Sequence, residues 1–228
     1  MNLKGMNVLV SAGGTREYID DVRVVTNIST GSLGAKIAEY FYEAGSKVHY
    51  VHSKQAFMPS CVGSQHDTSR LMTHQIVTVN DLKETMEALI KGFKIDIVIH
   101  SAAVSDFTFD RSVPIKLSSS SAEDFIEHMR KTIRPTVKII NLIKEWRPEV
   151  ILVGFKFTVG KTYDEMVDIA YKSLGTYNGD YVVVNDKVEM EKHKIHVAYL
   201  MGRFDSIILP MWGKNDIATR LVSIMDKR

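Results

Sequence analysis

Met6–Gly34 has the sequence MNVLVSAGGTREYIDDVRVVTNISTGSLG, and this stretch decides the fold. Its first seven residues form a short apolar run that ends in two glycines, a pattern typical of a buried strand followed by a turn. Ser32–Ala44 then places apolar side chains at helical spacing, and Gly45 is a good helix terminator. A strand, a long loop and a helix in this order predict the first unit of an α/β sheet.

The same alternation continues along the chain. Further strands are predicted at Lys47–His52, Gln75–Val79, Asp96–Ser101, Val150–Phe157 and Asp180–Val184, and an antiparallel pair at His196–Met201 and Ser206–Pro210. Further helices are predicted at Asp81–Lys91 with Asn80 as its cap, and at Pro135–Trp146, Tyr163–Leu174 and Lys214–Lys227. Together they predict an α/β fold: a Rossmann-like, mostly parallel sheet with helices on both faces.

Two segments break this alternation. Ala102–Asp124 is neither periodic nor apolar, so we expect it to leave the domain as an extruded flap. Residues 187–210 begin with a charged run, and we expect them to form a small antiparallel ribbon. Since a two-stranded ribbon is marginally stable alone, both segments are expected to pair with a second copy in a homodimer. No linker or repeat divides residues 1–228, which predicts one domain, and Ser53–Thr73 is predicted to be a long, mobile loop.

Composition and charge exclude several classes of partner. The net charge of +2 is too small to indicate nucleic acid or an anionic membrane. No apolar stretch approaches the roughly 18 residues that span a bilayer, and the first residues lack a signal-like region, so a cytoplasmic location is expected. The one cysteine, Cys61, cannot form an internal disulfide, and no Cys/His cluster has metal-ligand spacing.

The loop between the first strand and the first helix carries the strongest functional signal. Gly13 and Gly14 permit a close approach of the backbone to an anion. Ser29 and Gly31 precede the first helix, whose free N–H groups and positive dipole end favour phosphate. Loops this long inside a compact domain are usually functional. The sequence therefore predicts phosphate binding here, with a simple turn at the glycines as the alternative.

Other strand ends carry candidate residues as well, because ligands of open α/β sheets bind beyond the carboxyl ends of the strands. Ala102 and Ala103 leave room for a flat ligand. Asp106 is a candidate either for binding a hydroxyl, an amine or a metal ion, or for capping a turn. Phe155 is a candidate either for packing on a nucleobase or for the core. Lys116 is either a flap lysine that meets a ligand or an ordinary surface lysine.

The pattern is not that of the usual dinucleotide-binding proteins. The glycine loop reads GGTRE, so GxGxxG is absent, and the second strand ends Val51-His52-Ser53 without an acid for a ribose diol. Both features argue against a nicotinamide-dependent oxidoreductase. That enzyme class and a non-catalytic nucleotide-binding subunit remain the alternatives to a phosphate-using enzyme.

Taken together and in order, the segments GGTREYIDDVR, TNISTGSLG, AAVSDF, VGFKF and VVVND resemble the phosphopantothenate–cysteine ligase family, the ligase half of the DNA/pantothenate metabolism flavoproteins. The resemblance implies a monofunctional ligase of coenzyme A biosynthesis. The carboxylate of 4′-phosphopantothenate attacks the α-phosphate of CTP, or ATP, with Mg²⁺ present, and pyrophosphate leaves. The amine of L-cysteine then displaces the nucleotide monophosphate. The resemblance also implies a homodimer with shared sites, and a separate decarboxylase downstream.

The resemblance assigns roles to individual residues. It implies that Asn27 and Lys116 are catalytic, Asn27 by holding the acyl carbonyl and Lys116 by neutralising the nucleotide. Nucleotide binding is implied for Gly13, Gly14, Ala102, Ala103, Asp106, Lys116, Phe155 and Lys172, and binding of the substrate phosphate for Ser29, Gly31 and Gly34. Lys116 is followed by Leu117 and serines instead of further lysines, and a second lysine before the sixth strand is missing, so the choice between CTP and ATP stays open.

Overall fold

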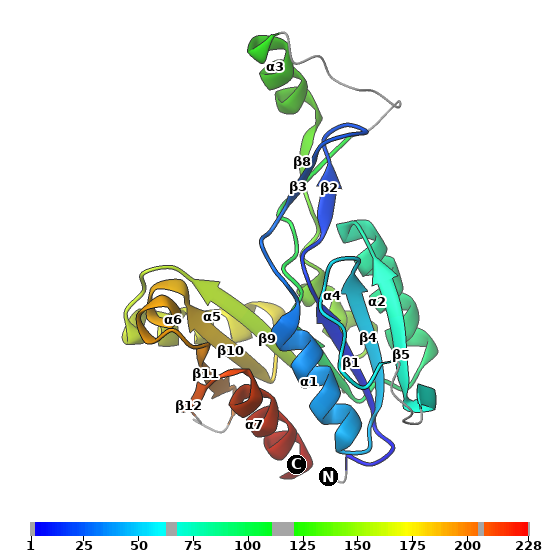
Figure 1. Ribbon diagram of the computed structural model, residues 1–228, viewed down its shortest axis with the longest axis vertical. Coiled ribbons are helices and arrows are strands. Elements are labelled where there is room, and N and C mark those ends of the chain that lie inside the picture. The colour runs from blue at the N-terminus through cyan, green and yellow to red at the C-terminus, as the bar shows by residue number, and fades with distance from the viewer. Residues whose placement is uncertain (1–2, 63–67, 111–120, 205–207, 228) are drawn as a thin grey trace.

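An eight-stranded sheet forms the centre of the molecule (Figure 1). The computed structural model describes residues 3–62, 68–110, 121–204 and 208–227. The strand order is β12-β11-β10-β9-β6-β1-β4-β5. The parallel strands are β1 (Asn7–Ala12), β4 (Lys47–Ser53), β5 (Leu71–Ile76), β6 (Ile97–His100), β9 (Ile151–Thr158) and β10 (Tyr181–Asp186). β11 (Val197–Gly202) and β12 (Ile208–Trp212) are antiparallel to their neighbours, so the predicted mostly parallel Rossmann-like sheet is confirmed.

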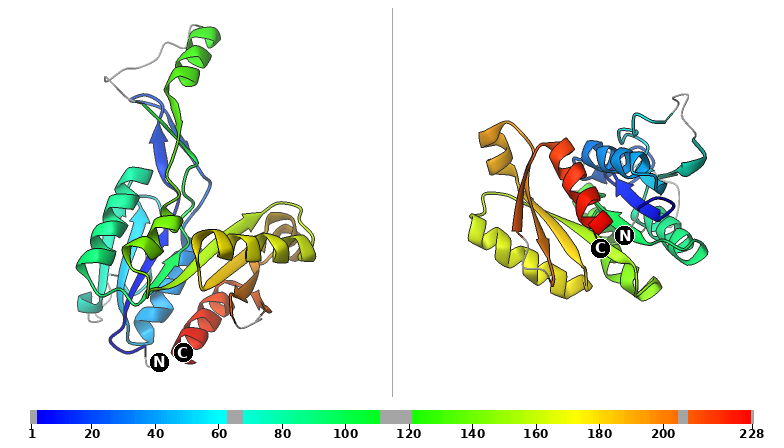
Figure 2. Two further views of the ribbon diagram at one scale, coloured as in Figure 1. Left: turned by 180° about the vertical axis from the view of Figure 1, so that it is seen from behind. Right: turned by 90° about the horizontal axis from the view of Figure 1, so that it is seen from below.

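Helices cover both faces of this sheet (Figure 2). Val8 and Val10 of β1 pack with α1 (Ser32–Glu43) and α7 (Lys214–Lys227) in one buried cluster. Leu9, which points to the opposite face, packs with α2 (Val79–Gly92), α4 (Ile139–Trp146) and α5 (Tyr163–Tyr177) in a second cluster. The alternation of side chains along a strand therefore produces two cores. Among the described residues, no helix combines the length and the apolar character needed to cross a bilayer.

An arm projects beyond the carboxyl end of β1 (Figures 1 and 2). It contains β2 (Arg16–Tyr18), β3 (Val24–Thr26), β7 (Phe107–Phe109), α3 (Ala122–Thr132) and β8 (Ile133–Pro135). The predicted flap therefore supplies β7 and the start of α3, and residues 111–120 lie outside the described residues. The hairpin of β2 and β3 inside the glycine loop is a further part of the arm that the sequence did not indicate.

One buried carboxylate fastens the arm to the body. Glu17, which is 3% exposed, accepts a hydrogen bond from the Val79 N–H at 2.7 Å with one carboxylate oxygen. Its other oxygen accepts from the Thr108 hydroxyl at 2.6 Å. Val79 is the first residue of α2, whose N–H groups favour a negative charge. Glu17 thus connects β2, β7 and α2, and its burial is compensated by two hydrogen bonds.

Several predicted boundaries are wrong for local reasons. The helix expected from Asp81 begins at Val79 because Thr78, not Asn80, is its cap: Thr78 and Asp81 form a reciprocal capping box. The helix expected from Pro135 begins at Ile139, since Pro135 lies in β8. The third strand covers Leu71–Ile76 and not Gln75–Val79.

The antiparallel strand pair predicted within residues 187–210 is confirmed as β11 and β12, but it is not a separate ribbon. The charged start of this segment is a short helix, α6 (Lys187–His193), which Asp186 caps by accepting from the N–H groups of Val188 and Glu189. β11 lies inside the main sheet between β10 and β12, and Val197 and Leu200 are fully buried there. These apolar residues are covered by their own chain, so they give no reason for a second copy to bind.

Candidate active site

The loops that follow β1 and β6 are hydrogen-bonded to each other beyond the end of the sheet. The Ala103 N–H donates to the Gly13 carbonyl at 2.8 Å, and the Thr15 N–H donates to the Ala103 carbonyl at 3.2 Å. The Ser105 N–H continues the series by donating to the Thr15 hydroxyl at 3.0 Å. Gly14 and Ala103 form an isolated parallel bridge between these bonds. The structure therefore brings the predicted residues Gly13, Gly14, Ala102 and Ala103 together.

Gly13 and Gly31 pack against each other and against the loop that follows β4. Both have positive φ angles, 85° and 67°. A Cβ atom on Gly13 would lie 2.2 Å from the Ser53 hydroxyl oxygen, and one on Gly31 would lie 2.8 Å from the Ala56 Cβ. The Phe57 N–H also donates to the Thr30 carbonyl at 2.9 Å. The first part of the predicted mobile loop is thus a support for the glycine loop, while residues 63–67 lie outside the described residues.

The start of α1 is an open positive end. Its N-cap is Gly31, which offers no side-chain hydrogen bond to the first turn. The Lys214 ammonium, from the start of α7, donates to the Ser32 hydroxyl at 2.7 Å. No carboxylate of the described residues lies within ion-pair distance of this lysine. The Ser32 N–H donates to the Thr30 hydroxyl at a long 3.4 Å. The N-terminal turn, its dipole and a lysine together suit a phosphate, and half-buried Ser29 lies two residues before Gly31.

Gly34 has a different environment from the other glycines. It is buried, and a Cβ atom there would lie 2.6 Å from the Ala12 Cβ and 2.7 Å from the Ser101 hydroxyl oxygen. The absence of a side chain lets α1 lie directly against the ends of β1 and β6. The packing of α1 therefore accounts for this glycine, and its predicted contact with phosphate stays a prediction.

Asn27 lies where the arm meets this loop cluster. Its side chain is exposed, and its amide nitrogen donates to the Val104 carbonyl at 3.0 Å. The Thr26 hydroxyl, one residue earlier, donates to the Thr15 carbonyl at 2.7 Å. The backbone of Asn27 passes so close to Gly14 that a Cβ on Gly14 would be 2.5 Å from the Asn27 carbonyl oxygen. Asn27 is therefore held over Gly14 with its amide directed at the loop after β6.

Asp106 forms an exposed ion pair with Lys138, which sequence reasoning missed. The two segments are fastened by the Thr136 N–H, which donates to the Asp106 carbonyl at 3.0 Å, and by the Thr136 hydroxyl, which donates to the Ser105 carbonyl at 2.6 Å. Exposed ion pairs typically contribute about 1 kcal/mol or less, so both charges are free to exchange partners for a ligand. No local pattern distinguishes Lys138 or Lys214 from surface lysines, because their roles depend on residues distant in the sequence.

Phe155 lies near this cluster, whereas Lys172 lies on another element. Phe155 directly follows Gly154, which the register pairs with His100 at the end of β6, and its half-buried side chain packs against the core on the side of α1 and α7. Lys172 is exposed on α5, nine residues after the start of that helix and so about 13 Å along its axis. Lys116 lies outside the described residues.

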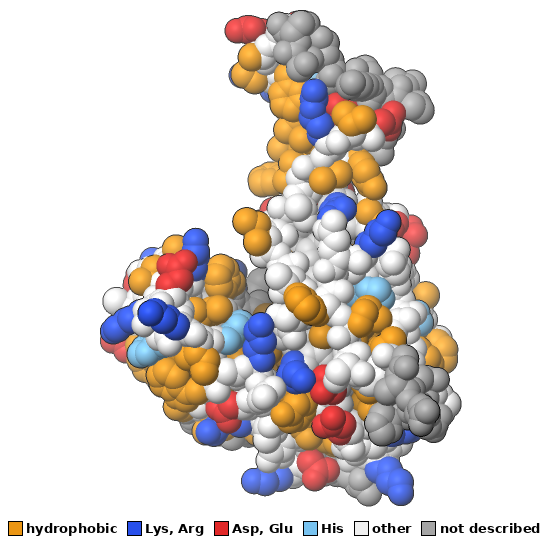
Figure 3. Space-filling view, in the orientation of Figure 1, with side chains coloured by type: hydrophobic (Ala, Val, Ile, Leu, Met, Phe, Trp, Pro, Cys, Tyr) orange, Lys and Arg blue, Asp and Glu red, His pale blue; other side chains and the backbone are white. Residues whose placement is uncertain are grey.

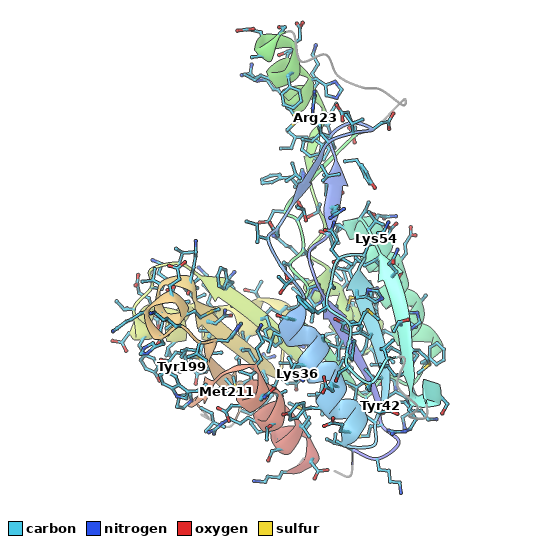
Figure 4. The ribbon with its side chains drawn as sticks, in the orientation of Figure 1. Arg23, Lys36, Tyr42, Lys54, Tyr199 and Met211 are labelled. Atoms are coloured by element: carbon cyan, nitrogen blue, oxygen red, sulfur yellow. The ribbon has the colours of Figure 1, made fainter. Side chains whose placement is uncertain are left out.

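On the arm, Arg23 places its guanidinium 5.2 Å from the centre of the Phe125 ring (Figure 4).

Asp186, the acid of the VVVND segment, has a structural role. Its burial alone would raise the pKa of the carboxyl. Hydrogen bonds from the Lys161 N–H, the Thr158 hydroxyl, and the N–H groups of Gly160 and Val188 outweigh that effect and hold the pKa at about 2. The carboxylate joins the loop after β9 to the start of α6 and has little capacity left for a ligand.

The sheet, with helices on both faces, defines a Rossmann-like α/β protein, and the glycine loop and the start of α1 lie at the carboxyl end of β1. Residues 3–227 match the DNA/pantothenate metabolism flavoprotein C-terminal domain, and the chain belongs to that family. A coenzyme A biosynthesis bifunctional protein CoaBC from Thermococcus kodakarensis is 35% identical over 226 residues, which cover 99% of this chain and 52% of the relative. The chain thus spans about half the length of such curated relatives.

Solved structures agree with this assignment. The DNA/pantothenate metabolism flavoprotein from Streptococcus pneumoniae superposes with a TM-score of 0.80 at 31% identity, covering 98% of this chain and 99% of the other. A Cab2 variant in complex with phosphopantothenate–cysteine superposes with a TM-score of 0.76 at 18% identity, covering 99% of this chain and 87% of the other. The second likeness shows the fold alone.

Proposed function

We propose that the chain is a phosphopantothenate–cysteine ligase of coenzyme A biosynthesis, with CTP as the preferred nucleotide and ATP as the alternative. The observation that carries the proposal is the junction of Gly13 and Gly14, Asn27 and the loop 102–106 at one edge of the sheet. These are the segments in which the sequence resembles ligases, and the structure places them in mutual contact. We further propose that the reaction takes place in the cytoplasm and that a decarboxylase consumes the product.

The reaction is written in two displacement steps. A carboxylate oxygen of 4′-phosphopantothenate attacks the α-phosphorus of the nucleotide, and the bond to pyrophosphate breaks. The amine of L-cysteine then attacks the acyl carbon, loses a proton, and the nucleotide monophosphate leaves. Positioning and charge stabilisation dominate such transfers. The start of α1 with Lys214 would hold phosphoryl oxygens, and the Asn27 amide would exchange the Val104 carbonyl for the acyl oxygen.

Mg²⁺ would accompany the nucleotide. The described residues contain no cluster of three or more His, Cys, Asp or Glu side chains suited to a metal ion. Mg²⁺ is usually held by one or two carboxylates together with substrate phosphates and water. Asp106, whose carboxylate is exposed at the site, is the residue that would hold it. When bound, Mg²⁺ would neutralise charge on the phosphates.

Pyrophosphate release tests the function directly. The chain should release pyrophosphate with CTP, more slowly with ATP, only when 4′-phosphopantothenate is present, and should form phosphopantothenoylcysteine when cysteine is added. Mass spectrometry of the product and an assay without 4′-phosphopantothenate are the controls. Release that does not depend on 4′-phosphopantothenate, or none with either nucleotide, would refute the ligase. Fluorescence titration with NADPH tests the oxidoreductase alternative in the same preparation.

We propose that the protein is a two-fold dimer joined through the arm. The arm exposes many apolar side chains, among them Val22, Val24, Val25, Ile28, Phe107, Ile126 and Ile133, and Figure 3 shows this apolar surface. Exposed apolar surface of this kind usually marks an interaction site. Ile126→Glu, at a side chain that is 57% exposed, should shift the mass in sedimentation from two copies to one. Val159→Glu, at a side chain that is 63% exposed outside the arm, should not.

Sharing of the sites between the two copies is tested by complementation. Asp106 is exposed at the base of the arm, so we propose that it reaches a nucleotide bound to the second copy. Inactive Asn27→Asp and inactive Asp106→Asn proteins should then regain activity when mixed under conditions of subunit exchange. A wild-type protein that sediments as a monomer would contradict the dimer. Heterodimers without activity would show that each site is built from one chain.

A further inference from the structure

We propose that His100 is a positioning residue for the nucleotide-binding loop 101–106, and that it acts through the hydroxyl of Ser11. This inference rests on the proposed function only in calling the loop nucleotide-binding. His100 is the last residue of β6, immediately before that loop, and is 6% exposed. Nothing in the reaction requires this imidazole to touch a substrate, and its ring nitrogen Nδ1 contacts the Ser11 hydroxyl on β1.

Hydrogen-bonding distances connect the His100 imidazole, the Ser11 hydroxyl and the Ala102 N–H. The Nδ1 atom of His100 lies 2.8 Å from the hydroxyl oxygen of Ser11, which is completely buried. The same oxygen accepts a hydrogen bond from the Ala102 N–H at 3.3 Å. Ser11 is on β1, and the register pairs it with His100 across the two parallel strands. The imidazole therefore contacts the one side chain that receives the first alanine of the loop.

Ser11 supplies an acceptor that the backbone does not. The Ser101 N–H donates to the Ser11 carbonyl at 3.2 Å, and the Ala103 N–H donates to the Gly13 carbonyl at 2.8 Å. The Ala102 N–H lies between these two, and its acceptor is the Ser11 side chain. Ala102 is half-buried, and a buried donor costs roughly 1–3 kcal/mol when it is left without a partner. The hydroxyl is thus part of the junction that holds the loop to the glycine segment.

The imidazole decides how this hydroxyl is oriented. A serine hydroxyl has one proton and two lone pairs. When the proton is donated to an unprotonated Nδ1, both lone pairs remain for other donors, and one of them meets Ala102. We assign the Nε2-protonated neutral tautomer to His100 on this ground. Burial lowers the pKa of His100 to about 4, so the imidazole is neutral at physiological pH and this arrangement persists there.

Three variants test the assignment. His100→Leu keeps an apolar body of similar size but removes the acceptor. His100→Asn places an amide oxygen near the position of Nδ1 and keeps an acceptor. Ser11→Ala removes the hydroxyl itself and makes only a small change of volume. Hydrogen exchange at the Ala102 amide should be at least tenfold faster in His100→Leu and Ser11→Ala than in wild type, and close to wild type in His100→Asn.

The KM values for the two substrates should show whether His100 positions the nucleotide-binding loop or only supports the fold. His100→Leu should raise the KM for the nucleotide about tenfold and leave the KM for cysteine unchanged, and His100→Asn should restore the nucleotide KM. Equal exchange at Ala102 in His100→Leu and wild type would overturn the proposal. So would a His100→Asn protein that behaves like His100→Leu, because the role would then be packing. Hydrogen exchange requires no turnover, so its result stands even if the ligase assay fails.

Discussion

Asn27→Asp should abolish product formation while leaving the fold intact. The substitution keeps the shape of the side chain, and this side chain is exposed with one hydrogen bond, to the Val104 carbonyl. The amide can donate to a developing acyl oxygen, whereas a carboxylate at the same place is a negatively charged acceptor. Loss of one such donor costs roughly 3–4 kcal/mol, or about 10²–10³ in kcat, and repulsion by the new charge adds to that loss.

The measurement is formation of phosphopantothenoylcysteine, followed by mass spectrometry and accompanied by thermal melting. Asn80→Asp, an exposed substitution at the start of α2, where a negative charge is favoured, is the matched control and should keep full activity. A melting temperature within a few degrees of wild type for both variants would show that the loss is chemical. Near-normal turnover of Asn27→Asp would remove Asn27 from the mechanism.

The glycine loop is an example of a feature that could be predicted from the sequence alone. Its length, its glycines and the helix that follows are local properties, and they lead to the prediction of phosphate binding, which stays a prediction. The central sheet could be predicted for the same reason, since apolar runs such as Val8–Val10 are buried wherever the fold places them. The arm was only partly predicted. Strands of three residues, such as Arg16–Tyr18 and Val24–Thr26, are too short to show alternation.

Residues that act through distant partners were missed. His100 and Ser11 are separated by 89 positions, and Lys214 and Ser32 by 182. Before the strand order is known, a histidine at the end of an apolar run has the pattern of any core residue. The apolar residues of β11 led to a different error. We expected a second copy of the chain to cover them, but they are buried by the sheet of their own chain. In both cases the missing information was which strands are neighbours.

Gly14→Ala should lower kcat about 100-fold although the residue needs no special backbone angle. The φ angle of Gly14 is not positive, so alanine brings no conformational strain of its own. Its Cβ would, however, lie 2.5 Å from the carbonyl oxygen of Asn27 and 3.3 Å from the Thr26 hydroxyl oxygen. A backbone oxygen cannot rotate away, so Asn27 and the end of β3 must move by about 1 Å, and a misplacement of that size can cost about 10²-fold in rate.

The control is Gly175→Ala, on α5. Nothing lies within 4 Å of a Cβ at Gly175, and its φ is not positive, so alanine should keep full activity and stabilise the helix by about 0.5–1 kcal/mol. The crucial comparison is between Asn27→Asp and the double variant Gly14→Ala with Asn27→Asp. If Gly14 acts by placing Asn27, Gly14→Ala should add little to the loss that Asn27→Asp already causes, because residues that act as a unit are not additive. Gly14→Ala with normal kcat would show that the site tolerates a displaced Asn27, and fully additive losses would show that Gly14 serves the phosphate and not the asparagine.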